Sequence, residues 1–475
     1  MKTYLNIDTF KYLLITSLLI LAGCAVPKNT PPIDDIAPFT FRNDAVKDQS
    51  SSVANLKWRD FFENKELASL IDKALVKNND LQVAIKDIEI ADQLYRKARQ
   101  GYLPEAGVSV SSSNSIPSKN SLNGLTASQF LGTKDLNNYT ASLAISWEAD
   151  IWGKVKNQKK EALAQYLQTQ EARKGIQTML IASIANGYYT LLMLDKQLAI
   201  AKENLVLNNN TLDIIKLQYE SAQVTSLAVQ QQEDQKLATE QLIPKLEKEI
   251  NIQENALSIL VGVTPGDIVR SGSLDEVQNK TNLSTGMPSE MLSLRPDVKS
   301  SELELQAASA RIGLAEANMY PSLTIGGSGG VNSLKTSDWF NVPSSLFGVI
   351  AGTIAQPILN GRKLRTQLNV AKIEREQSVL RFRQSVLVAY GEVSDALGRI
   401  DKLEKEQSIA ALRVRKLAIA KNNAELLFKS GMASYLEVIT AQGNALSAEL
   451  ELASIKREQI NASVDLYRSL GGGWN

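Results

Sequence analysis

Carboxylates are the main groups in this sequence that could do chemistry, because its 475 residues include no histidine and only one cysteine. That composition excludes histidine-based catalytic triads, metal clusters of histidine and cysteine, and disulfides within the chain. The 51 Asp and Glu residues are scattered through helical patterns without a recognisable catalytic site. The 52 Lys and Arg residues balance them almost completely, so we do not expect nucleic acid as a partner.

Glu437 is the one carboxylate whose position calls for an explanation. It lies in FKSGMASYLEV, residues 428–438, where a small polar run interrupts a long helical pattern. A related break, YESAQVTSLAV, occurs 209 positions earlier, but that stretch has Leu227 and Ala228 where the later one has Leu436 and Glu437. Taken alone, Glu437 fits a solvated acid in the first turn of a helix, where the helix dipole stabilises a negative charge by ~0.3–1 kcal/mol.

The single cysteine, Cys24, closes an amino-terminal targeting segment. The apolar run LLITSLLILAG is too short to cross a bilayer comfortably as a helix. It ends in LAGC, which resembles a bacterial lipobox, where cleavage precedes a cysteine whose thiol receives a diacylglyceryl group. We therefore predict a lipoprotein signal peptide over residues 1–23, lipidation of Cys24 and a lipidated extended tether over residues 24–57; a chance buried cysteine is the alternative. Ala25, in place of aspartate, favours sorting to the outer membrane by analogy with such lipoproteins.

The sequence carries two copies of one structural plan. Five pairs of matching positions keep a single offset of 209: Tyr219 with Phe428, Ser221 with Ser430, Leu227 with Leu436, Val229 with Val438 and Gly262 with Gly471. Other landmarks repeat in the same order with small shifts. Each half therefore reads as helix, strand, loop, strand, long helix, break and helix, which indicates an internal duplication.

Four alternating stretches are predicted to be strands: AGVSVSSSNSI, YTASLAISWEA, SLTIGGSGGV and SLFGVIAGTIAQ. In the second, Tyr139 and Trp147 begin and end an apolar side, and small or polar residues point the other way. Such segments, with aromatic residues at their ends, fit outer-membrane strands; a small soluble sheet is the alternative. Because an open sheet edge in lipid leaves backbone groups unsatisfied, four strands must be completed by other chains. Three copies give a twelve-stranded barrel.

Two proline-free runs, from Lys154 to Glu220 and from Arg362 to Lys429, predict helices that could each reach ~100 Å. Within the second run, a coiled-coil seam is predicted from apolar residues at spacings of three and four: Val379, Phe382, Val386, Ala389, Val393, Ala396, Ile400 and Leu403. The helices after the two breaks are too short to return alone, so we expect each to stack end to end with a short helix that leads into a strand. Continuous and stacked helices would then alternate around a cylinder that continues the barrel.

Nearly the whole chain resembles the TolC-type outer membrane factors, especially the lipoprotein branch that serves RND tripartite multidrug efflux systems. The stretches that carry the resemblance follow LAGC in order: WRDFFENKELASLIDKALVKNNDLQVA, RKARQGYLP, SWEADIWGKV, YYTLLMLDKQL, LSLRPDV and ARIGLAEANMYPSL. The resemblance implies a homotrimer with a twelve-stranded outer-membrane β-barrel continued by a long periplasmic α-helical barrel. It also implies a passive exit duct for drugs and other small molecules, docked to a periplasmic adaptor (membrane fusion) protein and an inner-membrane RND transporter. No catalysis, metal or cofactor is expected beyond the covalent lipid at Cys24.

From this resemblance we expect a mixed α and β fold, and we divide the chain after the tether into seven segments. We expect, in order, a periplasmic helix over 58–103, a β-barrel hairpin over 104–152, a long α-hairpin over 153–262, an inter-repeat equatorial segment over 263–295, a periplasmic helix over 296–320, a second β-barrel hairpin over 321–360 and a second long α-hairpin with a C-terminal equatorial end over 361–475.

The resemblance also implies roles for residues near the two breaks. In the family, rings of apolar and acidic residues close the periplasmic end just after the second break, where this chain has Leu436, Glu437 and Thr440. Phe428 and Ala433 stand where some members have tyrosine and arginine in a gate-holding network, and these departures argue against a polar, salt-bridged lock. The breaks themselves would be exposed tips that dock the adaptor, and the predicted docking residues are Ser221, Thr225, Ser226, Ser430, Gly431 and Ser434.

Several rival functions remain open at this point. Within the family, the chain could be a duct for type I protein secretion or for metal-ion efflux. Outside it, the long seams also fit a coiled-coil structural lipoprotein that spans the periplasm without a pore, which predicts no conductance in a planar bilayer. A carboxylate-based periplasmic hydrolase is a further alternative, but its acids form no recognisable site.

Overall fold

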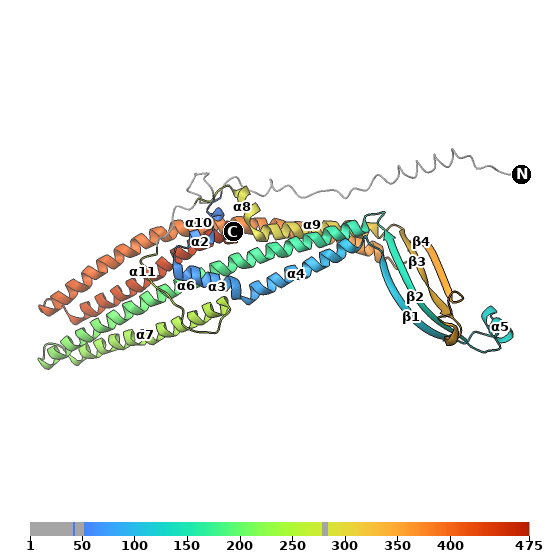
Figure 1. Ribbon diagram of the computed structural model, residues 1–475. Helices are drawn as coiled ribbons and strands as arrows, with labels where there is room; N and C mark the ends of the chain where they lie inside the picture. The colour runs from blue at the N-terminus through green and yellow to red at the C-terminus, as the bar shows by residue number, and fades with distance from the viewer. Residues whose placement is uncertain (1–40, 43–51, 278–283, 475) are drawn as a thin grey trace. The chain divides into compact units, whose positions relative to one another are not determined.

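The computed structural model describes residues 41–42, 52–277 and 284–474, which fall into two compact units. The sheet unit comprises Gln100–Lys159 and Ala308–Val379, and the helical unit comprises the other described residues. Figure 1 labels the elements. The strands are β1 Glu105–Ser115, β2 Leu136–Ala149, β3 Ser322–Ser333 and β4 Leu346–Ala355, and the helices are η2 Val53–Asn55, α2 Trp58–Phe61, α3 Lys65–Lys77, α4 Asn79–Gln100, α5 Leu122–Gln129, α6 Lys154–Glu220, α7 Ser226–Val261, α8 Pro288–Leu294, α9 Pro296–Ala317, η3 Thr336–Asp338, α10 Lys363–Lys429 and α11 Tyr435–Ser469.

The sheet unit is built on one antiparallel sheet with the strand order β1-β2-β3-β4. The four strands predicted from alternating sequence are confirmed, with ends that differ by three residues at most. The ladder pairs Val108 with Leu143, Leu143 with Gly329 and Gly329 with Gly348. The outer edges of β1 and β4 have no partner strand among the described residues.

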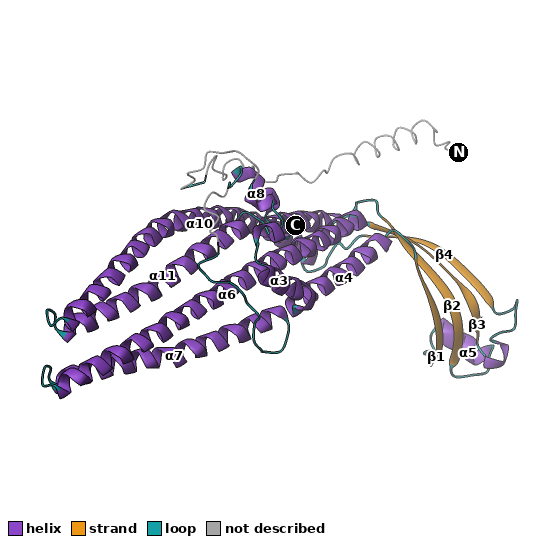
Figure 2. Cartoon of the chain, turned by 60° about the vertical axis from the view of Figure 1, so that its left-hand side comes forward, coloured by secondary structure: helices purple, strands orange, loops and turns teal. Residues whose placement is uncertain are grey.

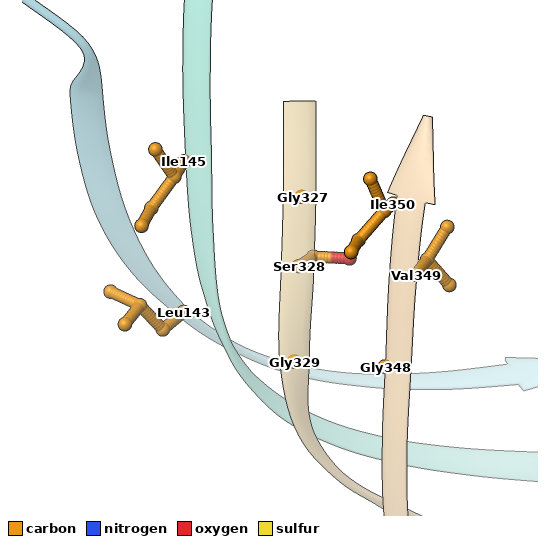
Figure 3. Close-up of a pocket in the computed structure, with 8 residues that line it drawn as sticks. All are labelled: Leu143, Ile145, Gly327, Ser328, Gly329, Gly348, Val349 and Ile350. Carbon is orange, nitrogen blue, oxygen red and sulfur yellow. The ribbon is translucent and has the colours of Figure 1, made fainter. Parts of the chain in front are cut away.

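The register sorts the strand residues into two different faces, because residues directly opposite in an antiparallel ladder share a face. One face is apolar and carries Val108, Val110, Tyr139, Leu143, Ile145, Trp147, Leu323, Ile325, Val331, Leu346, Ile350 and Ile354. The other is mainly hydroxyl and amide and carries Ser109, Ser111, Ser113, Thr140, Ser142, Ser146, Thr324, Ser328, Asn332 and Thr353, with Leu136, Phe347 and Val349 as its large apolar exceptions. Among the described residues much of the apolar face is exposed: Leu143, Ile145 and Ile350 (Figure 3) are 49%, 46% and 91% exposed.

Aromatic side chains stand at both ends of this sheet. At the end next to the start of α6, Trp152 stacks on Tyr320 with ring centroids 4.6 Å apart. At the opposite end, Tyr139 lies 5.7 Å from Trp339, centroid to centroid. From Tyr139 to Trp147, β2 extends by ~27 Å at ~3.4 Å per residue. That length matches the apolar band of ~25 Å between the aromatic girdles of outer-membrane barrels.

Two long helical hairpins, α6–α7 and α10–α11, dominate the helical unit (Figures 1 and 2). Their turns use the same backbone hydrogen bonds at the offset of 209 found in the sequence. Gln223 N donates to Gln218 O at 2.8 Å in the first turn, and Met432 N donates to Leu427 O at 2.8 Å in the second. These are Schellman bonds that close a helix end through a residue with positive φ. The matching geometry confirms the predicted duplication at its most similar part.

The predicted coiled-coil seam of α10 packs in the core of the helical unit. Seven of its eight residues are buried, and Val379 is half-buried. Val386, Ala389 and Val393 have no exposed surface, and they share one apolar cluster with Tyr188 and Leu191 of α6. The small side chains on this seam allow neighbouring helices to approach closely.

End-to-end stacking of short helices is confirmed in both repeats. Asn78 Oδ1 accepts from Leu81 N at 2.9 Å at the start of α4, and Asn78 Nδ2 donates to Leu260 O at 2.8 Å at the end of α7. In the second repeat, Arg295 precedes α9, and its Nη1 donates to Ser469 O at 2.8 Å at the end of α11. One polar side chain therefore joins two helix ends in each repeat.

The range 58–103, predicted as one helix, contains three helices, α2, α3 and α4. The divisions occur at asparagines that accept hydrogen bonds from the next helix. Asn64 Oδ1 accepts from Leu67 N at 2.8 Å, and Asn78 does the same for α4. Such N-caps end one helix and begin another while the apolar spacing continues, so the periodicity of the sequence did not reveal them.

The segment between the repeats packs on the long helices. Arg270 donates from Nε to Asp195 Oδ2 on α6 at 2.5 Å and also pairs with Glu254 on α7. Asp275 pairs with Lys196 of α6 at 2.9 Å and with Lys456 of α11 at 2.5 Å. These ion pairs attach the segment to both repeats.

Two sequence predictions concern residues beyond this description. Cys24 and the signal peptide lie outside the described residues, as does most of the predicted tether. Among the helices of the described residues, none has a stretch sufficiently long and apolar to span a bilayer.

Candidate functional site

The polar face of the sheet is the first part of the candidate site. Ser109 Oγ and Ser142 Oγ lie 3.0 Å apart across β1 and β2, and Asn332 Nδ2 donates to Asn138 Oδ1 at 2.8 Å across β3 and β2. The only charged residues within the four strands are Glu105 and Glu148. Both lie on this face near the start of α6, and Glu148 is paired with Lys154 at 2.9 Å. The face is therefore wettable and almost free of charge.

The two hairpin turns are the second part. All six residues predicted to dock an adaptor are exposed on these turns: Ser221, Thr225, Ser226, Ser430, Gly431 and Ser434. The two turns place Ala222 at φ 58° and Gly431 at φ 73°, 209 positions apart. Both turns thus present short polar side chains on the same backbone shape.

Glu437 has a local role in the single chain. Ser434 N donates to Glu437 Oε2 at 2.7 Å, which is one half of a capping box at the start of α11. In the first repeat Ala228 occupies the matching position and is fully buried. In one chain, Glu437 is therefore a solvated acid in the first turn of a helix, as its sequence position alone suggested. Its role in a ring formed by several chains stays a prediction.

The three predicted gate residues share one exposed surface of α11. Leu436 and Thr440 are four residues apart, and Glu437 and Thr440 are three apart, so the three side chains are neighbours on the helix. All three are exposed, with Leu436 at 54%. Leu436 also lines a depression of about 390 Å³ between α7 and α11, together with Gln230, Gln231, Asp234, Gln235 and Ile439. The sequence reasoning did not include the α7 residues of this depression.

A small apolar cluster holds the four helices together near the turns. Its buried members are Ile215 of α6, Ala228 of α7, Phe428 of α10 and Val438 of α11. Phe428 is 6% exposed and packs among these apolar residues. Phe428 therefore lies in an apolar environment in the single chain, and the lack of a polar, salt-bridged lock stays a prediction.

Buried amides form a further layer that the sequence reasoning missed. Gln442 Nε2 on α11 donates to Thr211 Oγ1 on α6 at 2.9 Å and to Glu425 Oε1 on α10 at 3.2 Å. Among the described residues, Gln232 Nε2 on α7 donates to Asn208 of α6 alone, within its own hairpin. The available signal was the spacing of Val438, Gln442 and Ala445, which places a glutamine in a buried seam.

These features define the protomer of an outer-membrane channel: an incomplete sheet with one lipid-compatible face and one polar face, together with long helical hairpins. The chain belongs to the outer membrane efflux protein family, whose model matches residues 70–263 and 287–472. The two matched segments cover most of the two repeats. The protein is thus a non-enzymatic channel of the bacterial outer membrane that extends into the periplasm.

Relatives in this family span nearly the whole chain. The probable outer membrane lipoprotein SilC of Salmonella typhimurium is 28% identical over 98% of this chain and 99% of its own. The cation efflux system protein CusC of Escherichia coli is 29% identical over 96% and 97%. The solvent efflux pump outer membrane protein SrpC of Pseudomonas putida is 28% identical over 98% and 99%. A crystal structure of CusC has a TM-score of 0.81 at 26% identity and covers 94% of this chain and 99% of its own.

Proposed function

We propose that the protein is the outer-membrane exit duct of a tripartite efflux pump, which passively conducts drugs and other small molecules to the exterior. An inner-membrane RND transporter would supply the energy, and a periplasmic adaptor would join the two. The observation that carries this proposal is the four-stranded sheet, whose apolar and polar faces fit lipid on one side and a water-filled lumen on the other.

A homotrimer completes the duct. The free edges of β1 and β4 cannot stay unpaired in lipid, and pairing β4 of one copy with β1 of the next closes the sheet. Three copies give twelve strands, which is wide enough for a lumen. Head-to-tail pairing of this kind makes every interface identical.

Exposed apolar residues on the helices favour the same closed ring. Within short runs they recur at spacings of seven, as in a coiled coil, and they are exposed among the described residues. On α10 these residues are Ile373, Leu380, Leu387, Leu412, Ile419 and Leu426. On α3, α4 and α7 they are Val76, Val83, Ile90, Ile252 and Ile259. Helices of neighbouring copies would cover both sets.

The gate of the duct is proposed at the start of α11. Three copies of Leu436 would form an apolar constriction, and three copies of Glu437 would form an acidic ring beside it, with Thr440 as a polar neighbour. Carboxylates around an axis repel one another by ~1 kcal/mol per pair at 4 Å in water, so the ring would bind cations and favour their passage. The bonds of Gln442 to α6 and α10 hold α11 in its present position.

The exposed turns are the proposed docking sites of the adaptor. They carry Ser221, Thr225 and Ser226 on the first hairpin and Ser430, Gly431 and Ser434 on the second. Cysteines placed at Thr225 and Ser434 should cross-link to the adaptor in intact cells. A lack of cross-links from both positions would contradict docking at the turns.

The proposed cargo is a small organic molecule. The relatives are named for cations in one case and for solvents in another, so their names support either cargo. The polar face of the sheet favours molecules that are uncharged or that have both polar and apolar parts, because hydroxyls and amides line it. Metal ions are the second candidate, and the described residues contain no cluster of three or more His, Cys, Asp or Glu side chains that could bind one.

The function is tested with a deletion strain and with the purified protein. We expect the deletion to raise the accumulation of dyes and antibiotics, and the wild-type gene to restore their export. Increased sensitivity to metal cations without dye accumulation would favour metal-ion efflux. The purified protein should conduct in a planar bilayer, whereas a structural lipoprotein without a pore would not.

A further inference from the structure

Two loops at one end of the sheet expose large apolar side chains to solvent. The β1–β2 loop spans 116–135 and includes α5, and the β3–β4 loop spans 334–345 and includes η3. Ile116, Leu122 and Phe130 are about 80% exposed on the first loop. Phe340 and Val342 are 68% and 59% exposed on the second. These values describe a single chain.

These side chains lie beyond the part of the sheet that fits the membrane. Both loops leave the sheet at the end marked by Tyr139 and Trp339, opposite the start of α6. Aromatic girdles mark the borders of the apolar band in outer-membrane barrels, so residues past this girdle face water. Several large apolar side chains exposed to water on neighbouring loops are typical of an interaction surface.

The strand order brings the two loops together between copies. The first loop follows the edge strand β1, and the second precedes the edge strand β4. If β4 of one copy pairs with β1 of the next, as the proposed trimer requires, the β3–β4 loop of one copy meets the β1–β2 loop of its neighbour. Within one chain the two loops are also neighbours, because β2 pairs with β3 and Tyr139 lies 5.7 Å from Trp339, centroid to centroid. The contact between copies would use the loop surfaces next to β1 and β4.

We propose that these loops form an apolar collar between copies at the outer mouth of the duct. Ile116, Leu122 and Phe130 of one copy pack against Leu334, Phe340 and Val342 of the next. The collar is repeated at each of the three interfaces and holds the ends of β1 and β4 together where the barrel leaves the membrane. This inference rests on the proposed trimer.

Cysteine pairs in the full-length protein test the collar, because the only native cysteine is Cys24. Phe130→Cys combined with Val342→Cys should give disulfide-linked oligomers in intact outer membranes after mild oxidation. A second pair set tests the trimer separately, with Val110→Cys on β1 and Gly348→Cys, Ile350→Cys or Gly352→Cys on β4. Cross-links from a seam pair without any from the loop pair would overturn the collar and keep the trimer. Failure of both sets would overturn both.

A substitution provides a second measurement. Phe130→Ser should lower the temperature at which the trimer dissociates in detergent by several degrees, because the apolar contact is lost. Asn123→Ser on the same loop is the matched control and should leave it unchanged. Equal dissociation temperatures for Phe130→Ser and Asn123→Ser would contradict the collar. Full labelling of Phe130→Cys by a bulky thiol reagent on intact cells would also contradict it, because the collar buries this position.

Discussion

Gln442 on α11 donates a hydrogen bond of 2.9 Å to Thr211 on α6, and both side chains are buried. This bond joins the second repeat to the first, because α11 and α6 belong to different hairpins. Gln232, a buried glutamine of α7, donates to Asn208 within its own hairpin and to no other described residue. The two repeats therefore share a fold but differ in the bonds of these glutamines: Gln442 bonds to the other hairpin, and Gln232 bonds within its own.

Gln442→Ala should loosen α11 from α6. The substitution removes the bonds to Thr211 and Glu425 and leaves the Thr211 hydroxyl with its bond to Leu207 O alone, at a cost of ~1–3 kcal/mol. We expect a higher resting conductance in single-channel recordings, because α11 carries the proposed gate. Gln232→Ala removes a bond of similar burial within one hairpin and serves as the matched control. Equal conductance in the two variants would argue against Gln442 as a residue that positions the gate.

Glu437 should be tested with a substitution that removes its negative charge and keeps the hydrogen bond that its side chain accepts from Ser434 N. Glu437→Gln keeps an acceptor for Ser434 N, since glutamine also serves in capping boxes, but removes the negative charge. We expect reduced cation selectivity and weaker block by divalent cations in Glu437→Gln, with an unchanged melting temperature. Glu437→Ala should lose selectivity and also cost ~1 kcal/mol of stability through the lost cap. If Glu437→Gln keeps the wild-type selectivity, the residue acts only as a cap.

At three positions with positive φ, the gain or loss of a β-carbon should change the stability of the protein by different amounts. Gly431 has open space around it, so Gly431→Ala should cost only the ~1–2 kcal/mol of a left-handed alanine. Gly262→Ala should cost more, because its β-carbon would lie 2.3 Å from Lys77 O. Ala222→Gly should stabilise the protein by ~0.5 kcal/mol, because relief of strain exceeds the entropy that glycine adds to the unfolded chain.

Urea denaturation of the detergent-solubilised protein measures the change in stability of Gly431→Ala, Gly262→Ala and Ala222→Gly. A loss of stability in Gly262→Ala no larger than in Gly431→Ala would contradict the close approach of α7 to the end of α3. A destabilised Ala222→Gly would contradict the backbone strain in the first turn.

The attachment of the inter-repeat segment should weaken in acid. Hydrogen bonds from Lys456 and then Lys196 lower the pKa of Asp275 below its ordinary value. A carboxyl with a lowered pKa stabilises the fold above its unfolded pKa of ~3.9, and this contribution disappears as the pH falls through the lower folded pKa. Hydrogen-exchange protection of residues 263–277 should therefore be constant from pH 7 to 5 and fall below about pH 4.

Asp275→Asn should show several-fold lower protection of this segment already at pH 7. Asp267→Asn is the control, because Asp267 is exposed and has no charged partner among the described residues. Full protection in Asp275→Asn at pH 7 would show that Arg270 alone holds the segment.

The long elements could be predicted because their signal is local and repeated. The proline-free runs gave the ends of α6 and α10 within one residue, and strict alternation gave all four strands. The caps at Asn64 and Asn78 could not be predicted, because one asparagine interrupts a helix without changing the apolar spacing. α5 was missed for a similar reason, since its eight residues lie in a loop and show no strong period.

The sequence by itself determined the duplication, the strands, the long helices and the positions of Leu436, Glu437 and Thr440 after the second turn. Periodicity and spacing are properties of the chain, so they can be read without coordinates. Only the tertiary structure decided that Glu437 caps α11, that Phe428 packs in an apolar cluster and that Gln442 reaches Thr211. Gln442 and Thr211 are 231 positions apart, and a contact over that distance depends on how the two hairpins pack.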